Sequence, residues 1–222
     1  AMKQSDFAHV ETWIFDLDNT IYPARHNLFD QVDKRIGAFI AGLLDIDAVA
    51  ARRLQKQYFR EYGTTLRGLM LHHHVDPHDF LGFVHDIDVD CLSPSPDLDR
   101  NLGRLAGRKV IFTNGSTGHA EAVLARLGVA KRFCGIFAIT DADFIPKPEA
   151  APYAAMIETF RINPRGAVMV EDIARNLVPA AALGMTTVWV RTDNAWGAEG
   201  SGGGHIHHVI DDVADWLAVL AG

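Results

Sequence analysis

Five short runs of apolar and β-branched residues recur along the chain and limit its fold more than any other feature. The runs cover residues 12–15, 109–112, 135–139, 167–170 and 186–190. Their apolar residues come in succession instead of alternating with polar ones, which is typical of strands covered on both faces of a parallel sheet. Helical patterns follow the later runs, over residues 119–127, 152–160 and 174–183. Strand, helix and strand in this order predict βαβ units and an open α/β sheet.

The interval between the first two runs, residues 16–108, is far too long for an ordinary crossover connection. Apolar residues recur in it at helical spacing from Leu28 to Leu43, and further helical patterns cover residues 47–62, 65–74 and 77–85. We therefore predict a helical cap domain over residues 22–96, inserted into an α/β core made of residues 1–21 and 97–222. Near the end of the chain, the glycine-rich residues 197–204 predict a mobile loop before a last helix over residues 213–220.

Side chains with catalytic chemistry follow four of the predicted strands, at the point where each strand ends. They are Asp16 and Asp18 after the first run, Thr113, Asn114 and Gly115 after the second, Lys147 after the third, and Glu171 and Asp172 after the fourth. Open parallel sheets bind their ligands along this carboxyl edge. We therefore expect the four loops to converge on one site.

The expected site combines clustered carboxylates with one ammonium group, a hydroxyl and backbone amides. Clustered carboxylates repel one another unless a cation neutralises them, and oxygen ligands suit a hard divalent metal, so we predict Mg²⁺. With a phosphate in the site, Asp16 can act as nucleophile, Thr113 and the loop amides can donate to phosphate oxygens, and Lys147 can balance charge. Asp18 can protonate the departing alkoxide and then deprotonate water.

These segments resemble the four motifs of the haloacid dehalogenase superfamily. The segments are Phe15-Asp16-Leu17-Asp18-Asn19-Thr20, Phe112-Thr113-Asn114-Gly115, Lys147-Pro148, and Glu171-Asp172 with Asn176. They occur in the order of that family and extend over about residues 12 to 190. The resemblance implies a Rossmann-like core with a helical cap between the first two motifs, and catalysis through an aspartyl-phosphate intermediate with magnesium.

The resemblance also implies a set of metal ligands. The ligands would be Asp16, the backbone carbonyl of Asp18, and Asp172 in preference to Glu171, with Asn176 orienting the acidic pair and Thr20 in support. Dehalogenases of this superfamily lack both the second aspartate and the metal. The presence of Asp18 therefore favours phosphoryl transfer over dehalogenation.

Three further segments resemble the pyrimidine 5′-nucleotidase branch of that superfamily. They are Ile21-Tyr22-Pro23, residues 61–69 and His119-Ala120. The branch dephosphorylates nucleoside monophosphates, especially those of uridine and cytidine, and the resemblance implies such a substrate here. Tyr22 and Arg67 are candidate contacts to the base or sugar, although Tyr22 is equally suited to hinge packing and Arg67 to the surface. A phosphatase for another small metabolite, such as phosphoglycolate or a sugar phosphate, is the alternative within the enzyme class.

A phospho-acceptor signalling domain is the alternative from another class. Receiver domains also combine an acidic pair, a phosphorylated Asp, a Thr or Ser and a Lys on a parallel sheet. In a receiver the acidic pair comes first, and the acceptor has no carboxylate two residues later. Here Asp16 precedes Glu171 and Asp172, and Asp18 would destroy the phosphorylated state quickly. The order of the motifs therefore favours the enzyme.

Several histidines gather in the predicted cap, at residues 72–74, 78 and 85. Adjacent histidines on a helix point in different directions, and no acidic or cysteine partners have matching spacing. We therefore expect these histidines to pack, to face solvent or to line the substrate pocket, and not to bind zinc. His119 is interpreted as a group near a helix start beside the site and not as a catalyst.

Charge and composition narrow the class of partner. The chain has 21 Lys and Arg residues against 28 Asp and Glu, which gives a formal net charge of −7 and disfavours binding to a nucleic-acid polymer. No run of about eighteen apolar residues is present for a membrane span. The two cysteines, Cys91 and Cys134, agree with a reducing compartment. We therefore predict a cytoplasmic monomer or homodimer whose partner is a small phosphorylated metabolite.

Overall fold

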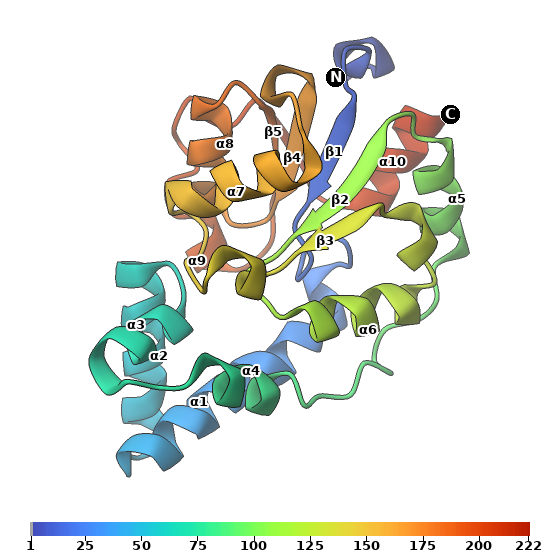
Figure 1. Ribbon diagram of the computed structural model, residues 1–222. Coiled ribbons are helices and arrows are strands. Elements are labelled where there is room, and N and C mark those ends of the chain that lie inside the picture. The colour runs from blue at the N-terminus through green and yellow to red at the C-terminus, as the bar shows by residue number, and fades with distance from the viewer. Residues whose placement is uncertain (1) are drawn as a thin grey trace.

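The computed structural model describes residues 2–222 and contains a six-stranded sheet. The strands are β1 (Thr12–Phe15), β2 (Arg108–Phe112), β3 (Gly135–Phe137), β4 (Ala167–Glu171), β5 (Thr186–Val190) and β6 (His208–Ile210). Their order is β3-β2-β1-β4-β5-β6, and all neighbours pair in parallel. β1 therefore lies inside the sheet between β2 and β4, and the predicted α/β fold is confirmed (Figure 1).

Helices cover both faces of this sheet (Figure 1). Helices α5 (Pro96–Arg104), α6 (Thr117–Leu127) and α10 (Val213–Ala221) lie on one face, and α7 (Ala150–Phe160) and α8 (Val178–Ala182) lie on the other. In β1, Phe15 packs with the first group and Ile14 with the second. This two-sided burial explains why the strands are apolar in succession. None of the helices described in residues 2–222 is long and apolar enough to cross a membrane.

A helical insertion lies between β1 and β2 and is placed beyond the carboxyl ends of the strands (Figure 1). It consists of α1 (Leu28–Leu44), α2 (Ala48–Tyr62), α3 (Thr65–His73) and α4 (Pro77–Val84). Its buried side chains form a hydrophobic cluster of their own, to which Val32, Tyr58, Leu69 and Phe80 belong. The helical cap expected from the sequence is confirmed, and its limits at residues 22 and 96 stay a prediction.

The chain after β4 differs from the sequence prediction. Residues 174–183 form a 3-10 helix (Ala174–Leu177) followed by α8, with Pro179 in the first turn, where no backbone N–H donor is required. The glycine-rich segment, predicted as a loop, overlaps the short helix α9 (Ala195–Ala198), and β6 follows at the edge of the sheet. A three-residue strand is too short to show a periodicity in the sequence.

Further short elements complete the chain. The other 3-10 helices cover Gln4–Phe7, Ala24–His26, Ala130–Arg132, Ile139–Ala142 and Pro164–Gly166. The strand β3 ends at Phe137, so the last residues of the predicted strand over 135–139 lead into a 3-10 helix instead.

Cap and core meet at Gly63, which ends α2 with a φ of 89°. A side chain at this position would place its Cβ 2.8 Å from the carbonyl oxygen of Lys147, which is closer than real contacts allow. Glycine therefore permits both the left-handed backbone and the close approach of the cap to the loop that carries Lys147. From the core, Arg175 donates to the carbonyl oxygens of Phe59 at 2.6 Å and Arg60 at 3.2 Å, at the end of α2.

Candidate active site

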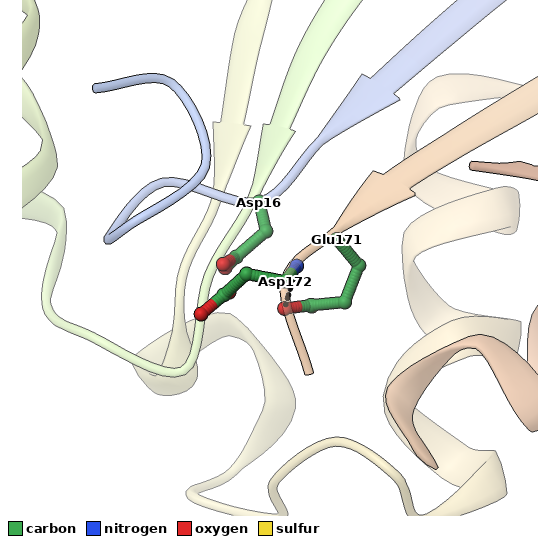
Figure 2. A group of neighbouring side chains, drawn as sticks. All are labelled: Asp16, Glu171 and Asp172. Atoms are coloured by element: carbon green, nitrogen blue, oxygen red, sulfur yellow. Dashed lines mark hydrogen bonds between the residues drawn. The ribbon is translucent and has the colours of Figure 1, made fainter. Parts of the chain in front are cut away.

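Three carboxylates lie together at the carboxyl ends of two neighbouring strands. Asp16 follows β1, while Glu171 ends β4 and Asp172 comes directly after it. One oxygen of each residue lies within 4.8 Å of the others, and all three residues are buried (Figure 2). Among residues 2–222, this is the one group of His, Cys, Asp and Glu side chains with metal-site spacing. The structure thus brings the first and fourth motifs together.

Lys147 is buried beside this acidic cluster. Its Nζ donates to Oδ1 of Asp16 at 3.0 Å, to Oε2 of Glu171 at 2.8 Å and to the carbonyl oxygen of Phe112 at 2.7 Å. Its three N–H donors therefore all have acceptors. Burial acts to lower the pKa of Lys147, but the charges of Asp16 and Glu171 outweigh it and raise the pKa. The side chain is thus an ammonium ion fixed against the cluster.

The two members of the acidic pair differ in their partners. Glu171 accepts from Lys147 with Oε2 and from two backbone N–H groups, at 3.1 and 3.2 Å, with Oε1. The Oδ1 of Asp172 lies 3.2 Å from the hydroxyl of Thr20, which is also 3.2 Å from Oδ2 of Asp16. A hydroxyl has one proton and donates to one of these oxygens at a time. Asp172 therefore keeps more lone pairs free for a cation than Glu171 does.

The charges of the cluster do not balance within the protein. Burial and the charge of Glu171 raise the pKa of Asp16 to about 7, against the opposing effect of Lys147. Burial and the charges of Glu171 and Asp16 raise the pKa of Asp172 well above its ordinary value. Fully ionised, the three carboxylates and one ammonium have two excess negative charges, which a divalent cation would offset. The oxygen-rich donor set fits a hard ion such as Mg²⁺.

Asp18 lines the same cavity as Asp16. The hydroxyl of Tyr22 donates to its Oδ1 at 2.6 Å, and Nε2 of His119 lies 2.9 Å from Oδ1 and 3.1 Å from Oδ2. Burial acts to raise the pKa of Asp18, but the charge and hydrogen bond of His119 and the hydrogen bond from Tyr22 outweigh it and lower the pKa. Asp18 is therefore a carboxylate held in one orientation.

A stacked pair of histidines lies beside Asp18. The rings of His85 and His119 are 4.2 Å apart with planes 7° from parallel, and Nδ1 of His85 lies 2.8 Å from Oγ of Ser116. Burial acts to lower the pKa of His119, but the charge of Asp18 outweighs it and raises the pKa. Burial and the charge of His119 lower the pKa of His85 to about 3. His119 from the core, whose pKa is raised, thus stacks on His85 from the cap, whose pKa is lowered.

Sequence reasoning placed His119 near the site but gave it no contact with Asp18, and it gave His85 no particular role. The His-Ala pair after the second motif is the signal for His119, which lies in the first turn of α6. The signal for His85 is absent from its neighbourhood in the sequence, because only the packing of the cap on the core brings it to the site.

The second motif also lines the cavity, to which Thr113, Asn114 and Gly115 all contribute. The N–H of Gly115 donates to Oγ1 of Thr113 at 3.0 Å, which shapes a tight turn. The side chain of Asn114 accepts the N–H of Lys147 at 2.9 Å and donates to its carbonyl oxygen at 3.2 Å. Asn114 therefore fixes the loop that carries Lys147, and the Thr113 hydroxyl keeps its proton for a ligand.

The structure also places three further residues that were proposed from the sequence. Tyr22 is buried with its hydroxyl on Asp18, and Arg67 is half-buried on α3; neither lines the cavity. Asn176 is buried and lines the cavity, but within residues 2–222 its side chain makes no hydrogen bond to Glu171 or Asp172. Tyr22 thus acts on Asp18, and Arg67 has no contact with the site in this structure.

The cavity between core and cap has a volume of about 150 Å³. Its cap side is largely apolar and includes Phe29, Val32, Ile36, Phe59, Leu66 and Phe80. Trp196 of α9 lies against two of these rings, 6.4 Å from Phe29 and 5.4 Å from Phe59 between centroids. A substrate would therefore meet polar groups at the sheet edge and an apolar, partly aromatic wall on the cap.

The neighbouring histidines of α3 and its end pack within the cap. Nε2 of His72 lies 2.6 Å from the hydroxyl of Tyr62, and Nε2 of His73 lies 2.8 Å from that of Tyr58. Neither belongs to a cluster with metal-site spacing in the part of the chain that the structure describes. His72 is exposed and His73 half-buried, and each contacts a tyrosine of α2.

Comparison with known proteins places the chain in a family. A family model described as haloacid dehalogenase-like hydrolase matches residues 10–184, more than half of the chain. A curated protein of Saccharomyces cerevisiae, Phosphate metabolism protein 8, is 26% identical over 220 residues, which cover 91% of this chain and 62% of that protein. The chain therefore spans less than two thirds of the length of this relative.

Solved structures share the fold at low sequence identity. An HAD phosphatase from Thermococcus onnurineus aligns with a TM-score of 0.63 and 21% identity, over 96% of this chain and 99% of that one. L-2-haloacid dehalogenase from Xanthobacter autotrophicus aligns with a TM-score of 0.55 and 19% identity over the same shares. The HAD-hydrolase YfnB from Bacillus subtilis, bound to magnesium, aligns with a TM-score of 0.58 and 14% identity, over 95% of this chain and 98% of that one. Phosphatase and dehalogenase thus share the fold, so the site must decide between them.

Proposed function

The chain belongs to the haloacid dehalogenase-like hydrolase family, and from this membership we propose that it is a magnesium-dependent phosphomonoesterase that acts through an aspartyl-phosphate. The observation that carries the proposal is the position of Asp18, which lines the cavity together with Asp16. An alkoxide leaving group needs a proton, and a carboxyl group beside the nucleophile can supply it. A halide leaves without one, so dehalogenation needs no acid at the position of Asp18.

Magnesium fits the acidic cluster because the excess of two negative charges is buried. Asp16, the backbone carbonyl of Asp18 and Asp172 would hold the ion, whereas Glu171 is committed to Lys147 and to backbone N–H groups. When bound, Mg²⁺ supplies positive charge that reduces the repulsion between an anionic nucleophile and an anionic phosphate.

The first step forms a bond between a carboxylate oxygen of Asp16 and phosphorus and breaks the bond from phosphorus to the leaving oxygen. An anionic phosphate beside Asp18 favours the protonated form of this residue. Asp18 gives that proton to the leaving oxygen, which departs as an alcohol. Lys147, at 3.0 Å from Asp16, and the hydroxyl of Thr113 offset charge on the transferring group.

The second step returns the enzyme to its starting state. The Asp18 carboxylate accepts a proton from water, and the water oxygen forms a bond to phosphorus. The bond between phosphorus and Asp16 breaks, and inorganic phosphate leaves. His119 and Tyr22 hold Asp18 in the orientation that both proton transfers require. The same carboxyl group thus acts first as an acid and then as a base.

We propose a pyrimidine nucleoside 5′-monophosphate as the substrate. Support comes from the resemblance of the motifs to that branch and from the rings of Phe29, Phe59 and Trp196, on which a base could stack. The volume of about 150 Å³ favours a second candidate. It lies below the roughly 300–1,000 Å³ of typical small-molecule sites, which favours a small leaving group such as that of a sugar phosphate or phosphoglycolate.

Hydrolysis of p-nitrophenyl phosphate tests the reaction class. We expect turnover with Mg²⁺ and its loss on adding EDTA, and undiminished activity in EDTA would reject the metal assignment. A panel of phosphomonoesters then tests the substrate. We expect uridine and cytidine monophosphate to be hydrolysed faster than purine nucleotides, sugar phosphates and phosphoglycolate. Equal or reversed rates would reject the nucleotide proposal.

A further inference from the structure

The cap side of the cavity carries a buried polar atom without a hydrogen-bond partner, Oε1 of Gln55 in α2. The residue is 2% exposed and lines the cavity. Buried acceptors in folded proteins nearly always have a donor, because an unpaired one costs stability. Within residues 2–222, the other unpaired buried side-chain atoms are Nε of Arg175 and Nε1 of Trp216, and neither residue lines this cavity.

Asp33 of α1 fixes the orientation of the Gln55 amide. Nε2 of Gln55 donates to Oδ1 of Asp33 at 2.7 Å and to its carbonyl oxygen at 3.2 Å. Rotating the amide by half a turn would bring Oε1 against these two acceptors, so the hydrogen bonds assign nitrogen and oxygen. The hydroxyl of Thr65 also donates to the backbone carbonyl of Gln55 at 3.0 Å. Oε1 is therefore a rigid acceptor that cannot turn into a donor.

No protein group described in residues 2–222 donates to this acceptor. A Cβ at Gly37 of α1 would lie 3.4 Å from Oε1, whereas glycine has no side chain there. Lys56 is a nearby cation that also lines the cavity, but its Nζ is turned to Asp33 at 3.3 Å. Asp33 also accepts from Arg52. The described cations of this region are thus directed to Asp33, and Oε1 is left for a group that the protein does not supply.

We propose that Gln55 selects the leaving group of the substrate by accepting a hydrogen bond from one of its N–H or O–H groups. The proposal rests on the phosphomonoesterase function given above. The favoured class is an alcohol with an apolar or aromatic body, which meets the cap wall, and a donor on the part that reaches Gln55. A leaving group that ends in a carboxylate, as in phosphoglycolate, would place two acceptors against each other. A binding site discriminates strongly against a substrate that leaves one of its buried polar groups without a hydrogen-bond partner.

The substitution Gln55→Met tests the proposal, because it keeps the length of the side chain and removes the acceptor. The assay measures kcat/KM of the full chain with Mg²⁺ on two sets of phosphomonoesters. Uridine monophosphate, ribose 5-phosphate and glycerol 1-phosphate carry donors; butyl, phenyl and p-nitrophenyl phosphate do not. The ratio compares kcat/KM for the best substrate of the first set with kcat/KM for the best of the second. We expect this ratio to be about 10- to 100-fold lower in Gln55→Met than in wild type. An unchanged ratio would overturn the proposal.

A matched control comes from the same helix. Gln57 is exposed, and its Nε2 donates to Glu61 at 3.0 Å. Gln57→Met is therefore expected to leave the ratio unchanged. If it lowered the ratio as much as Gln55→Met does, the effect would belong to the helix and the proposal would fall.

Gly37→Ala decides the question if Gln55→Met does not fold, as judged by circular dichroism and thermal unfolding. The added methyl group would lie 3.4 Å from Oε1 and leave the bonds from Gln55 to Asp33 in place. Gly42→Ala is the control, since a Cβ there meets nothing within 4 Å. Alanine is favoured over glycine inside a helix, so both variants are expected to fold. The ratio should fall in Gly37→Ala alone, and equal ratios in the two variants would reject the proposal.

The wild-type chain separates this proposal from the one on which it rests. Absence of magnesium-dependent hydrolysis on all six compounds would refute the phosphomonoesterase function, and selection by Gln55 with it. Hydrolysis with the same ratio in wild type and Gln55→Met would refute the role of Gln55 alone.

Discussion

Nε2 of His119 lies 2.9 Å from Oδ1 of Asp18, and the His119 ring also stacks on His85 of the cap, with ring centroids 4.2 Å apart. Asp18 follows β1, His119 begins α6 and His85 follows α4. A carboxylate on a loop would otherwise sample several orientations. Here the imidazole of His119 and the phenol of Tyr22 hold it, and His85 of the cap covers the imidazole. The orientation of the proposed acid therefore depends on contacts between core and cap.

Loss of the contact between His119 and Asp18 should slow the hydrolysis of some substrates more than that of others. We expect His119→Ala to lower kcat/KM, which reports the steps up to release of the alcohol, about 10- to 100-fold for an alkyl phosphate, since an alkoxide needs the proton from Asp18. The loss on p-nitrophenyl phosphate should be smaller, because its phenolate leaves without a proton. Steady-state kinetics on both substrates measures the difference, with the exposed His9→Ala as control. Equal losses on the two would contradict an action through the acid role of Asp18.

Replacement of the proposed nucleophile should stop turnover without unfolding the chain. Asp16→Asn keeps the size of the side chain but removes the attacking carboxylate, so we expect kcat to fall about 10³-fold or more. Circular dichroism should show an intact fold, because the substitution also relieves a buried like-charge cluster. Asp97→Asn, at an exposed carboxylate, serves as the control. Wild-type rates in Asp16→Asn would place the nucleophile elsewhere.

The two members of the acidic pair should respond differently to neutralisation. Asp172→Asn should raise the Mg²⁺ concentration for half-maximal activity about 10- to 100-fold, because Asp172 has lone pairs free for the ion. Glu171→Gln breaks a buried pair with Lys147 and should lower the free energy of unfolding by about 3 kcal/mol. Magnesium titration and urea unfolding of both variants measure these effects. If Glu171→Gln raised the Mg²⁺ requirement and Asp172→Asn did not, Glu171 would be the main ligand.

Acid should weaken the protein through His85. Its folded-state pKa is about 3, below the ordinary 6.5, so between these values the unfolded chain binds the proton more readily. Stability is therefore expected to fall as the pH drops from 6.5 towards 3, because burial and the charge of His119 disfavour a protonated His85, against the opposing effect of Asp18. His85→Phe keeps a stacked ring and removes this proton. Urea unfolding from pH 7.5 to 4 should show that the free energy of unfolding declines less in His85→Phe than in wild type. Parallel declines in the two proteins would exclude His85 as the cause of the acid sensitivity.

Local patterns were sufficient to predict the strand ends that Asp16 and Asp172 follow, whereas Lys147 lies in a longer loop after β3. In a parallel sheet buried on both faces, each strand is a continuous apolar run, and the polar residue that follows marks the edge. β6 was missed because three residues at the edge of the sheet show no period. The role of Arg67 stays a prediction, since a resemblance in the cap gives its residue type but not the direction of its side chain.

The sequence by itself determined the order of strands and helices, the insertion of the cap and the four loops that meet at the sheet edge, because these depend on period and on local chemistry. Only the tertiary structure decided which groups restrain Asp18 and which cap atom lacks a partner. His119 is 101 residues from Asp18, and Gln55 is 22 residues from Asp33. Such contacts arise from the packing of separate helices, whose side-chain directions are set by burial and hydrogen bonding in three dimensions and leave no spacing to read in the chain.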